Sequence, residues 1–223
     1  QIEFPTNQPV SYIMGGNFGD LNLDGFPDLY LGTGSAAMDA LVPNKMYVYS
    51  NGNFFRDVTH TGSFGHLLKG HGIGFGDFNN NGRPEVYGVM GGAYEGDPGR
   101  NVLIANRQLP KNNWISLQLR GKKSNRAAIG ARVKITVETQ EQGDTRTIHH
   151  TVSSGSSFGG NSFRAEIGLG KSTSIQSLRI DWPHRESSQQ VFKDIAVNQH
   201  LMITEGSSPI TRRNLSSYEF SYP

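Results

Sequence analysis

Short apolar runs alternate with turns rich in Gly, Asn and Asp along most of this 223-residue chain. In the first half, residues 45–50 precede the turn at residues 51–53, and residues 86–90 precede Gly91-Gly92. Bounded runs of this kind predict β-strands, and no segment sustains the 3.6-residue period of a helix. The pattern therefore predicts an all-β protein. Further strands are expected at 114–119, 131–139, 146–153, 162–167, 175–181 and 200–205.

The pattern divides the chain into two modules and a tail. Residues 99–112, which contain Pro110, form the predicted boundary. We therefore expect a repeat module at 1–110, a second β domain at 111–206 and a C-terminal tail at 207–223. The short alternating strands of the second domain are typical of an antiparallel β-sandwich or a barrel-like domain.

A nine-residue loop with regularly spaced oxygen ligands begins at Asp20. Oxygen-bearing side chains stand at its positions 1, 3, 5 and 9, and Gly25 at position 6 permits a sharp turn. A backbone carbonyl at position 7 would add a further ligand, as in other calcium loops. Apolar residues follow directly, so the loop leads into a strand. The expected ligands are Asp20, Asn22, Asp24, Asp28 and the carbonyl of Phe26.

The same loop recurs 57 residues later, with its own Gly, Pro and closing acid. Two copies in register predict two cation sites, although turns stabilised by Asx hydrogen bonds remain the alternative, mainly for the second copy. Calcium is expected over magnesium because many oxygens are offered in flexible geometry. The second site has only two acids and should be weaker. Its expected ligands are Asp77, Asn79, Asn81, Glu85 and the carbonyl of Arg83.

These loops and their surroundings resemble a known family. Phe18-Gly19-Asp20 and the Asp-x-Asn-x-Asp-Gly pattern resemble the FG-GAP (VCBS-type) repeat of integrin-like β-propellers. Residues 124–133, Ile167-Gly168-Leu169-Gly170 and Asp181-Trp182-Pro183 resemble the ASPIC/UnbV domain of cartilage-acidic-protein-like chains. The resemblance implies propeller blades with structural calcium, followed by a second β domain. The departures are Asn81 and Glu85 in place of Asp, and His184 in place of Gly.

A propeller closes with about four to eight blades, whereas the sequence shows two cation loops. We expect that these are the last blades of a propeller in a longer protein. The alternatives are blades supplied by other chains, or repeats that pack on the second domain in another way. The tail, with Tyr218, Phe220 and Tyr222 on alternate positions, and the similar Ile2-Glu3-Phe4 could pair with a sheet edge in another subunit or fold back.

Composition and charge limit the classes of partner and the cellular location that are expected. The chain has no Cys and no 18-residue apolar run, so neither disulfides nor a transmembrane helix is expected. Residues 1–110 carry 6 basic and 10 acidic residues, whereas residues 111–223 carry 15 and 9. The basic residues of the second half are too dispersed to indicate nucleic acid. The chain is expected to be extracellular or periplasmic.

The favoured function is adhesion, surface attachment or structural assembly, with a protein or glycan partner or a second copy. The alternative is an enzyme acting on a glycan or small metabolite beside a structural calcium site. That alternative would need a pocket holding His71 together with a carboxylate of raised pKa. No catalytic residue is expected.

Overall fold

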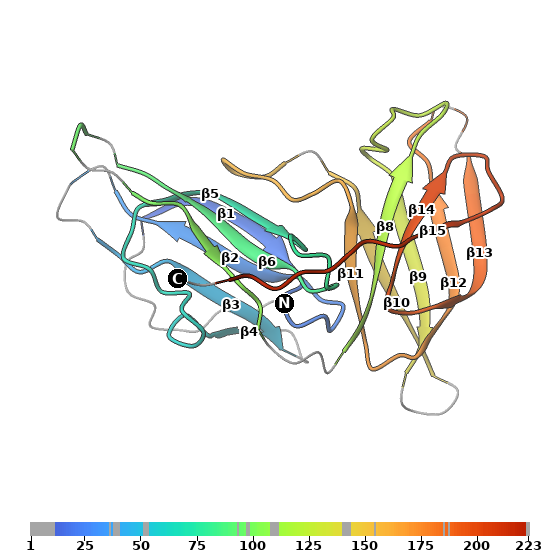
Figure 1. The fold of residues 1–223 in the computed structure, drawn as a ribbon, viewed down its shortest axis with the longest axis horizontal. Helices are drawn as coiled ribbons and strands as arrows, with labels where there is room; N and C mark the ends of the chain where they lie inside the picture. The colour runs from blue at the N-terminus through green and yellow to red at the C-terminus, as the bar shows by residue number, and fades with distance from the viewer. Residues whose placement is uncertain are drawn as a thin grey trace.

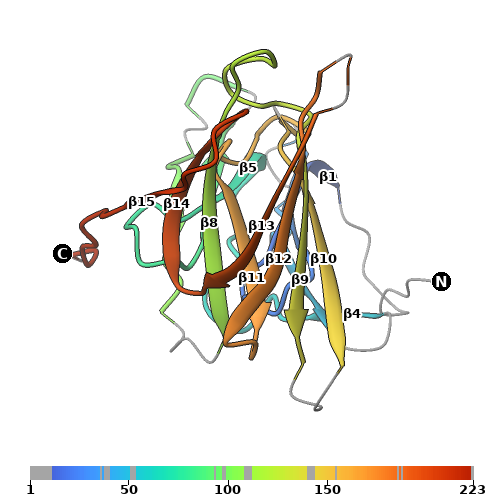
Figure 2. The ribbon, with the colours of Figure 1, turned by 90° about the vertical axis from the view of Figure 1, so that its right-hand side faces the viewer.

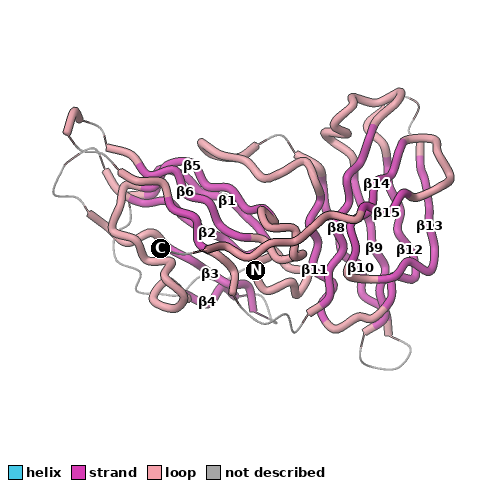
Figure 3. The backbone as a smooth tube through the Cα atoms, in the orientation of Figure 1, coloured by secondary structure: helices cyan, strands magenta, loops and turns pink. Residues whose placement is uncertain are grey.

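The computed structural model describes residues 12–35, 37, 41–50, 54–92, 94–96, 99–107, 112–139, 144–153, 155–184, 186 and 188–221. These residues form strands and loops without a helix, as Figure 3 shows, which confirms the all-β expectation. In the described residues there is accordingly no helix that could span a membrane. The expected turn at 51–53, Pro110, Tyr222 and the segment Ile2-Glu3-Phe4 lie outside the described residues.

The first module consists of two small sheets of the kind expected for propeller blades. Their first two strands have the same lengths and lie 57 residues apart, so the sequence repeat is also a structural repeat. The first blade has the order β1-β2-β3-β4 and the second the order β5-β6-β7. The strands are β1 (Ile13–Gly19), β2 (Asp28–Thr33), β3 (Lys45–Ser50), β4 (Phe54–Asp57), β5 (Gly70–Gly76), β6 (Glu85–Met90) and β7 (Val102–Ile104).

The two blades stack face to face over a shared apolar core, with β5 lying against β1 and β2. Tyr30 and Met46, paired across β2 and β3, are fully buried at this contact. Val86 and Ile104 face them from the second blade. Each large side chain that leaves water in such a core contributes about 1.5–3 kcal/mol to the hydrophobic term, so the stacked blades stabilise one another.

The second blade leaves open the face that the first blade buries. Tyr87 and Leu103 are paired across β6 and β7 as Tyr30 and Met46 are paired in the first blade. Their exposed fractions are 36% and 40%, against 0% for both residues of the first blade. Phe78, which corresponds to the buried Leu21, is 46% exposed, and its ring lies 6.3 Å from that of Tyr87. An apolar sheet face of the stacking type is therefore exposed to solvent.

The second domain is a two-layer sandwich (Figures 1 and 2). One sheet has the order β10-β9-β12-β13 and the other β11-β8-β14-β15, and a continuous aliphatic core lies between them. The expected antiparallel sandwich is found except for one pairing, because β8 and β14 run parallel. The strands are β8 (Asn113–Arg120), β9 (Arg132–Glu138), β10 (Thr145–Thr151), β11 (Ala165–Gly170), β12 (Ser174–Asp181), β13 (Gln189–Ala196), β14 (Gln199–Thr204) and β15 (Thr211–Arg213).

The tail folds back on its own chain. It first adds β15 to the edge of β14 and then runs from the second domain to the repeat module, as the dark red segment of Figure 1 shows. There Tyr218 donates from its backbone N–H to the Asn79 carbonyl (3.2 Å) and from its hydroxyl to the Phe78 carbonyl (2.7 Å). Of the two expected arrangements, this chain shows the intramolecular one for residues 214–221.

Candidate functional site

The two predicted cation loops connect the first two strands of each blade. The first runs from the end of β1 to Asp28 at the start of β2, and the second from the end of β5 to Glu85 at the start of β6. Both place a residue at position 4 and a Gly at position 6 in the left-handed region: Leu23 and Gly25 in the first, Asn80 and Gly82 in the second. The loops are therefore the same turn built twice.

The first loop is wound around its own carboxylates. Asp20 accepts hydrogen bonds from the backbone N–H groups of Asp24 (3.1 Å) and Gly25 (2.9 Å). The Asn22 side chain accepts from the N–H of Asp24 at 3.0 Å, and the Asp24 side chain accepts from the N–H of Phe26 at 2.9 Å. The closing Asp28 reaches back to the N–H of Leu21 at 2.8 Å. The oxygen-bearing side chains at positions 1, 3, 5 and 9 thus all turn into the loop.

Each of these five hydrogen bonds has an equivalent in the second loop. Asp77 accepts from the N–H groups of Asn81 and Gly82 at 2.9 and 3.0 Å. Asn79 accepts from Asn81 N–H, Asn81 accepts from the N–H at position 7, and Glu85 reaches back to the N–H at position 2. The substitution of Glu for Asp at the closing position is therefore accommodated without loss of this contact.

Both loops bury carboxyl groups close to one another, which opposes the ionisation of these groups. Burial, reinforced by repulsion from Asp28 and Asp24, raises the pKa of Asp20 well above its usual range. Burial also raises the pKa of Asp28 to about 7, against the opposing effect of its backbone hydrogen bonds. In the second loop burial raises the pKa of Glu85 to about 7, and repulsion from Asp77 adds to this shift. A bound cation would remove this repulsion.

One buried oxygen supports the fit of a cation to the second loop. Glu85 is fully buried, and its Oε1 atom has no hydrogen-bond partner among the described residues. Its other oxygen accepts from Phe78 N–H at 3.0 Å, so the carboxylate faces the loop. An unmatched buried oxygen costs free energy that a hard cation would recover. Across the described residues no three His, Asp or Glu side chains are gathered as a metal site by themselves, so amide and carbonyl oxygens would have to complete the coordination.

Strand β11 of the second domain lies across the start of both loops. At the first loop, Gly168 donates its N–H to Asp20 at 3.0 Å, and a Cβ atom at Gly168 would stand 2.2 Å from that carboxylate. At the second loop, Glu166 accepts from Asp77 N–H at 2.9 Å. Because residues 166 and 168 lie on the same face of a strand, one strand contacts both loops, and only glycine fits at the first.

Two arginines of the second domain bind the loops. Arg146 donates to the carbonyl of Asp24 at 2.6 Å, and its guanidinium lies 5.3 Å from the centre of the Phe26 ring. Arg164 donates to the carbonyl of Asp77 at 2.6 Å and forms an ion pair with Glu166 at 2.9 Å. The repeat loops are therefore also the contact surface between the two domains.

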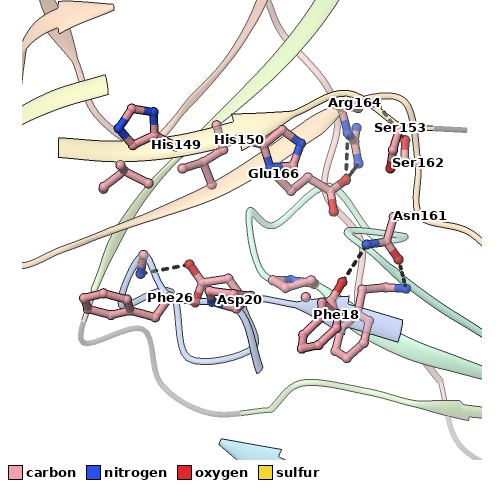
Figure 4. A pocket seen from close by; sticks show the side chains of 17 residues that line it. Phe18, Asp20, Phe26, His149, His150, Ser153, Asn161, Ser162, Arg164 and Glu166 are labelled. Carbon is pink, nitrogen blue, oxygen red and sulfur yellow. Dashed lines mark hydrogen bonds and ion pairs between the residues drawn. The ribbon is translucent and has the colours of Figure 1, made fainter. Parts of the chain in front are cut away.

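A polar turn of the second domain joins the innermost strands of the two blades. Asn161 accepts hydrogen bonds from the Asn17 side chain (2.7 Å) and from Phe75 N–H (2.8 Å), and donates to the Phe18 carbonyl (2.7 Å). It thereby bridges β1 and β5, as Figure 4 shows. No pattern in the sequence gave a signal for this contact.

A cavity of about 200 Å³ lies between the domains and is shown in Figure 4. Asp20 and Glu166 line it from opposite domains, together with His149 and His150 of β10. Burial raises the pKa of Glu166 to about 7 and lowers that of His150. Both carboxylates are held by hydrogen bonds, to Gly168 and to Arg164 respectively. These contacts point to a structural role for the two acids.

His71, the histidine named in the enzyme alternative, lies outside this cavity. Nδ1 of His71 is 3.1 Å from the Lys69 carbonyl, and its ring meets Phe158 edge-on at 6.4 Å between centroids. His71 does not line the cavity that Asp20 and Glu166 share. The two features named above for an enzyme are thus not brought together in the described residues.

Sequence reasoning missed four residues of this site: Glu166, Arg164, Asn161 and Arg146. A signal for the first was present, because Glu166, Gly168 and Gly170 alternate on one face of β11. Glycines on one face of a strand indicate close approach of another segment, and an acid beside them indicates a polar contact there.

Comparison with known proteins finds two matching segments in the chain. Residues 20–88 match the family described as FG-GAP-like repeat, and residues 121–210 match the family ASPIC and UnbV. A search of curated proteins found no significant match. The matched segments occur in the order expected from the motifs, and they contain the two cation loops and strand β11. This chain is therefore an FG-GAP-type repeat protein that carries an ASPIC/UnbV domain.

Proposed function

We propose that this chain is an extracellular or periplasmic calcium-binding protein that acts in adhesion, surface attachment or structural assembly. The observation that carries the calcium assignment is the pair of loops with five equivalent hydrogen bonds around converging oxygens. The unmatched Oε1 atom of buried Glu85 supports the same conclusion for the second loop. The ion would be structural: it would neutralise carboxylates that otherwise repel one another at the domain contact.

The open face of the second blade supports a role in assembly. Phe78, Tyr87 and Leu103 occupy the positions at which the first blade is covered by its neighbour. The occupant that this face fits is therefore another sheet of the same repeat type, presenting aliphatic residues as Val86 and Ile104 do. Exposed apolar patches of this kind mark protein contacts in soluble proteins.

Light scattering after size-exclusion chromatography, with calcium and then with excess chelator, tests this proposal. We expect calcium-dependent multimers that are lost in Leu103→Asp, because a charge would be buried without a partner. Val191→Asp is the matched control, since Val191 is 54% exposed on β13 of the second domain. A monomer of wild-type protein under all conditions would rule out self-assembly and direct attention to a separate protein or glycan partner.

A further inference from the structure

The two loops differ in formal charge. The first contains three carboxylates, Asp20, Asp24 and Asp28, whereas the second contains Asp77 and Glu85 and has Asn81 at its fifth position. Counting only the repeat, the second loop should attract a divalent cation less strongly, because affinity in such loops rises with ligand charge. The second domain changes the number of charged groups next to the second loop.

Glu166 brings a third carboxylate to the second loop. Its Oε2 atom lies 2.9 Å from the backbone nitrogen of Asp77, and its side chain is only 12% exposed. Its charge acts on the closing acid of the loop, because repulsion from Glu166 contributes to the raised pKa of Glu85. At the first loop the corresponding β11 residue is Gly168, which brings a backbone N–H and no charge. Among the residues that the structure describes, the second loop alone therefore gains an acid from the other domain.

Arg164 brings a positive charge to the same place. Its Nη2 atom lies 3.8 Å from Oδ2 of Asp77 and 2.9 Å from Oε1 of Glu166. It also donates to the side chain of Asn80 within the loop at 3.1 Å. At the first loop, Arg146 donates to the carbonyl of Asp24, and no ion pair between Arg146 and a loop carboxylate occurs in the described residues. Within the described part of the chain, an arginine of the second domain is thus paired with a loop carboxylate at the second loop and not at the first.

We propose that the second domain sets the calcium affinity of the second loop through two residues of opposite effect, Glu166 strengthening binding and Arg164 weakening it. This inference rests on the proposed calcium binding and names what regulates one of the two sites. Neither residue needs to coordinate the ion. Each acts through its charge at the first residue of the loop, in a partly buried setting where solvent screens charge less than at an open surface.

Terbium competition on the full chain at about pH 8 tests the inference. Trp114 lies against the second loop, since a Cβ atom on Gly82 would be 1.9 Å from its indole ring. Excitation of this tryptophan should therefore sensitise Tb³⁺ mainly at the second loop, and added CaCl₂ displaces it. Isothermal titration calorimetry with CaCl₂ measures calcium binding at both loops together.

Opposite shifts are the expected result. Glu166→Gln should weaken calcium binding at the second loop about tenfold, and Arg164→Gln should strengthen it about tenfold, a change of about 1.4 kcal/mol each. The double variant should return to within about threefold of wild type. Arg179→Gln is the matched control, because Arg179 forms its ion pair with Asp181 of the same strand, β12, and it should leave the terbium signal unchanged. Arg164→Lys keeps the charge and should bind as wild type does.

Two other outcomes would overturn the inference, and they differ in what they say about calcium. If both variants weaken binding, or neither changes it, the two residues act only by holding the loop in shape and the inference is wrong. Because Arg164→Lys and Glu166→Asp preserve charge, a change seen in these two folded variants would also count against a charge effect. If the wild-type chain binds no calcium at either loop, the proposed function itself fails.

Discussion

Replacing Gly82 by Ala should destabilise the chain by about 2–5 kcal/mol. Two costs add. Gly82 has φ +84°, in the left-handed region, where a Cβ atom costs roughly 1–2 kcal/mol. The new methyl group would also stand 1.9 Å from the indole of Trp114, a clash that must be relieved by shifting a packed side chain. Overpacking of this kind costs about 1–3 kcal/mol.

Gly96 provides a control with the same backbone conformation. Its φ is +83°, and a Cβ atom there would meet nothing within 4 Å. Gly96→Ala should therefore cost only the backbone part, roughly 1–2 kcal/mol. The difference between the two variants, about 1–3 kcal/mol, isolates the contact between the second loop and the second domain. Urea unfolding followed by far-ultraviolet circular dichroism measures it, with constant m-values required for the comparison.

Removing the ring should rescue the loop. In a Trp114→Ala background, Gly82→Ala should cost no more than Gly96→Ala does, because the clash has no partner left. The interaction free energy from this double-mutant cycle should be about 1–3 kcal/mol. Equal losses for Gly82→Ala and Gly96→Ala in the wild-type background would refute the reasoning, since they would show that Trp114 does not press on the loop.

Three further predictions concern pH and packing. In chelator, burial holds the pKa of Asp28 and of Glu85 near 7 in the folded chain, so the folded state binds more protons than the unfolded state between about pH 4 and 7. The free energy of unfolding should fall as pH rises through that window, and calcium should reverse the trend; stepped-pH urea unfolding checks this. Met46→Ala should cost about 2–5 kcal/mol and Leu103→Ala less than about 1 kcal/mol, because only Met46 is buried; the same unfolding assay compares them. Burial opposes ionisation of Glu205, but backbone hydrogen bonds prevail and lower its pKa to about 2. Stability from Glu205 should be present above about pH 4.5 and lost as pH falls toward 2, and Glu205→Gln should abolish that dependence in acid unfolding.

The loops could be predicted from sequence because their structure is local. In the first loop, Asp20, Asn22 and Asp24 each bond to backbone within five residues, so spacing alone specifies the turn. The repeat at 57 residues then confirmed the pattern on a second copy. Strand positions could be predicted from the alternation of apolar and polar residues for the same reason, because consecutive side chains of a strand point to opposite faces of the sheet.

Contacts between the domains could not be predicted in this way. Asn161 is hydrogen-bonded to Phe75 and Asn17, which precede it in the chain by 86 and 144 positions. No local pattern distinguishes it from any other asparagine in a turn. The parallel pairing of β8 with β14 was missed because alternation indicates a strand but not its direction. The exposure of Tyr87 could not be predicted either, because its position in the repeat is that of the buried Tyr30. Only the presence of a neighbouring sheet distinguishes the two residues.

The position of β11 implies that ion binding and domain docking are not independent. Gly168 and Arg146 bind a carboxylate and a carbonyl of the first loop, and Glu166 and Arg164 bind the first residue of the second. An ion that orders these loops lowers the entropic cost of docking the second domain, and a docked domain orders the loops for the ion. Such coupling is reciprocal by thermodynamic necessity. The proposed calcium binding therefore predicts that this shared contact is the part of the chain most sensitive to calcium removal. The sandwich core should be the least sensitive, because its aliphatic side chains pack against one another.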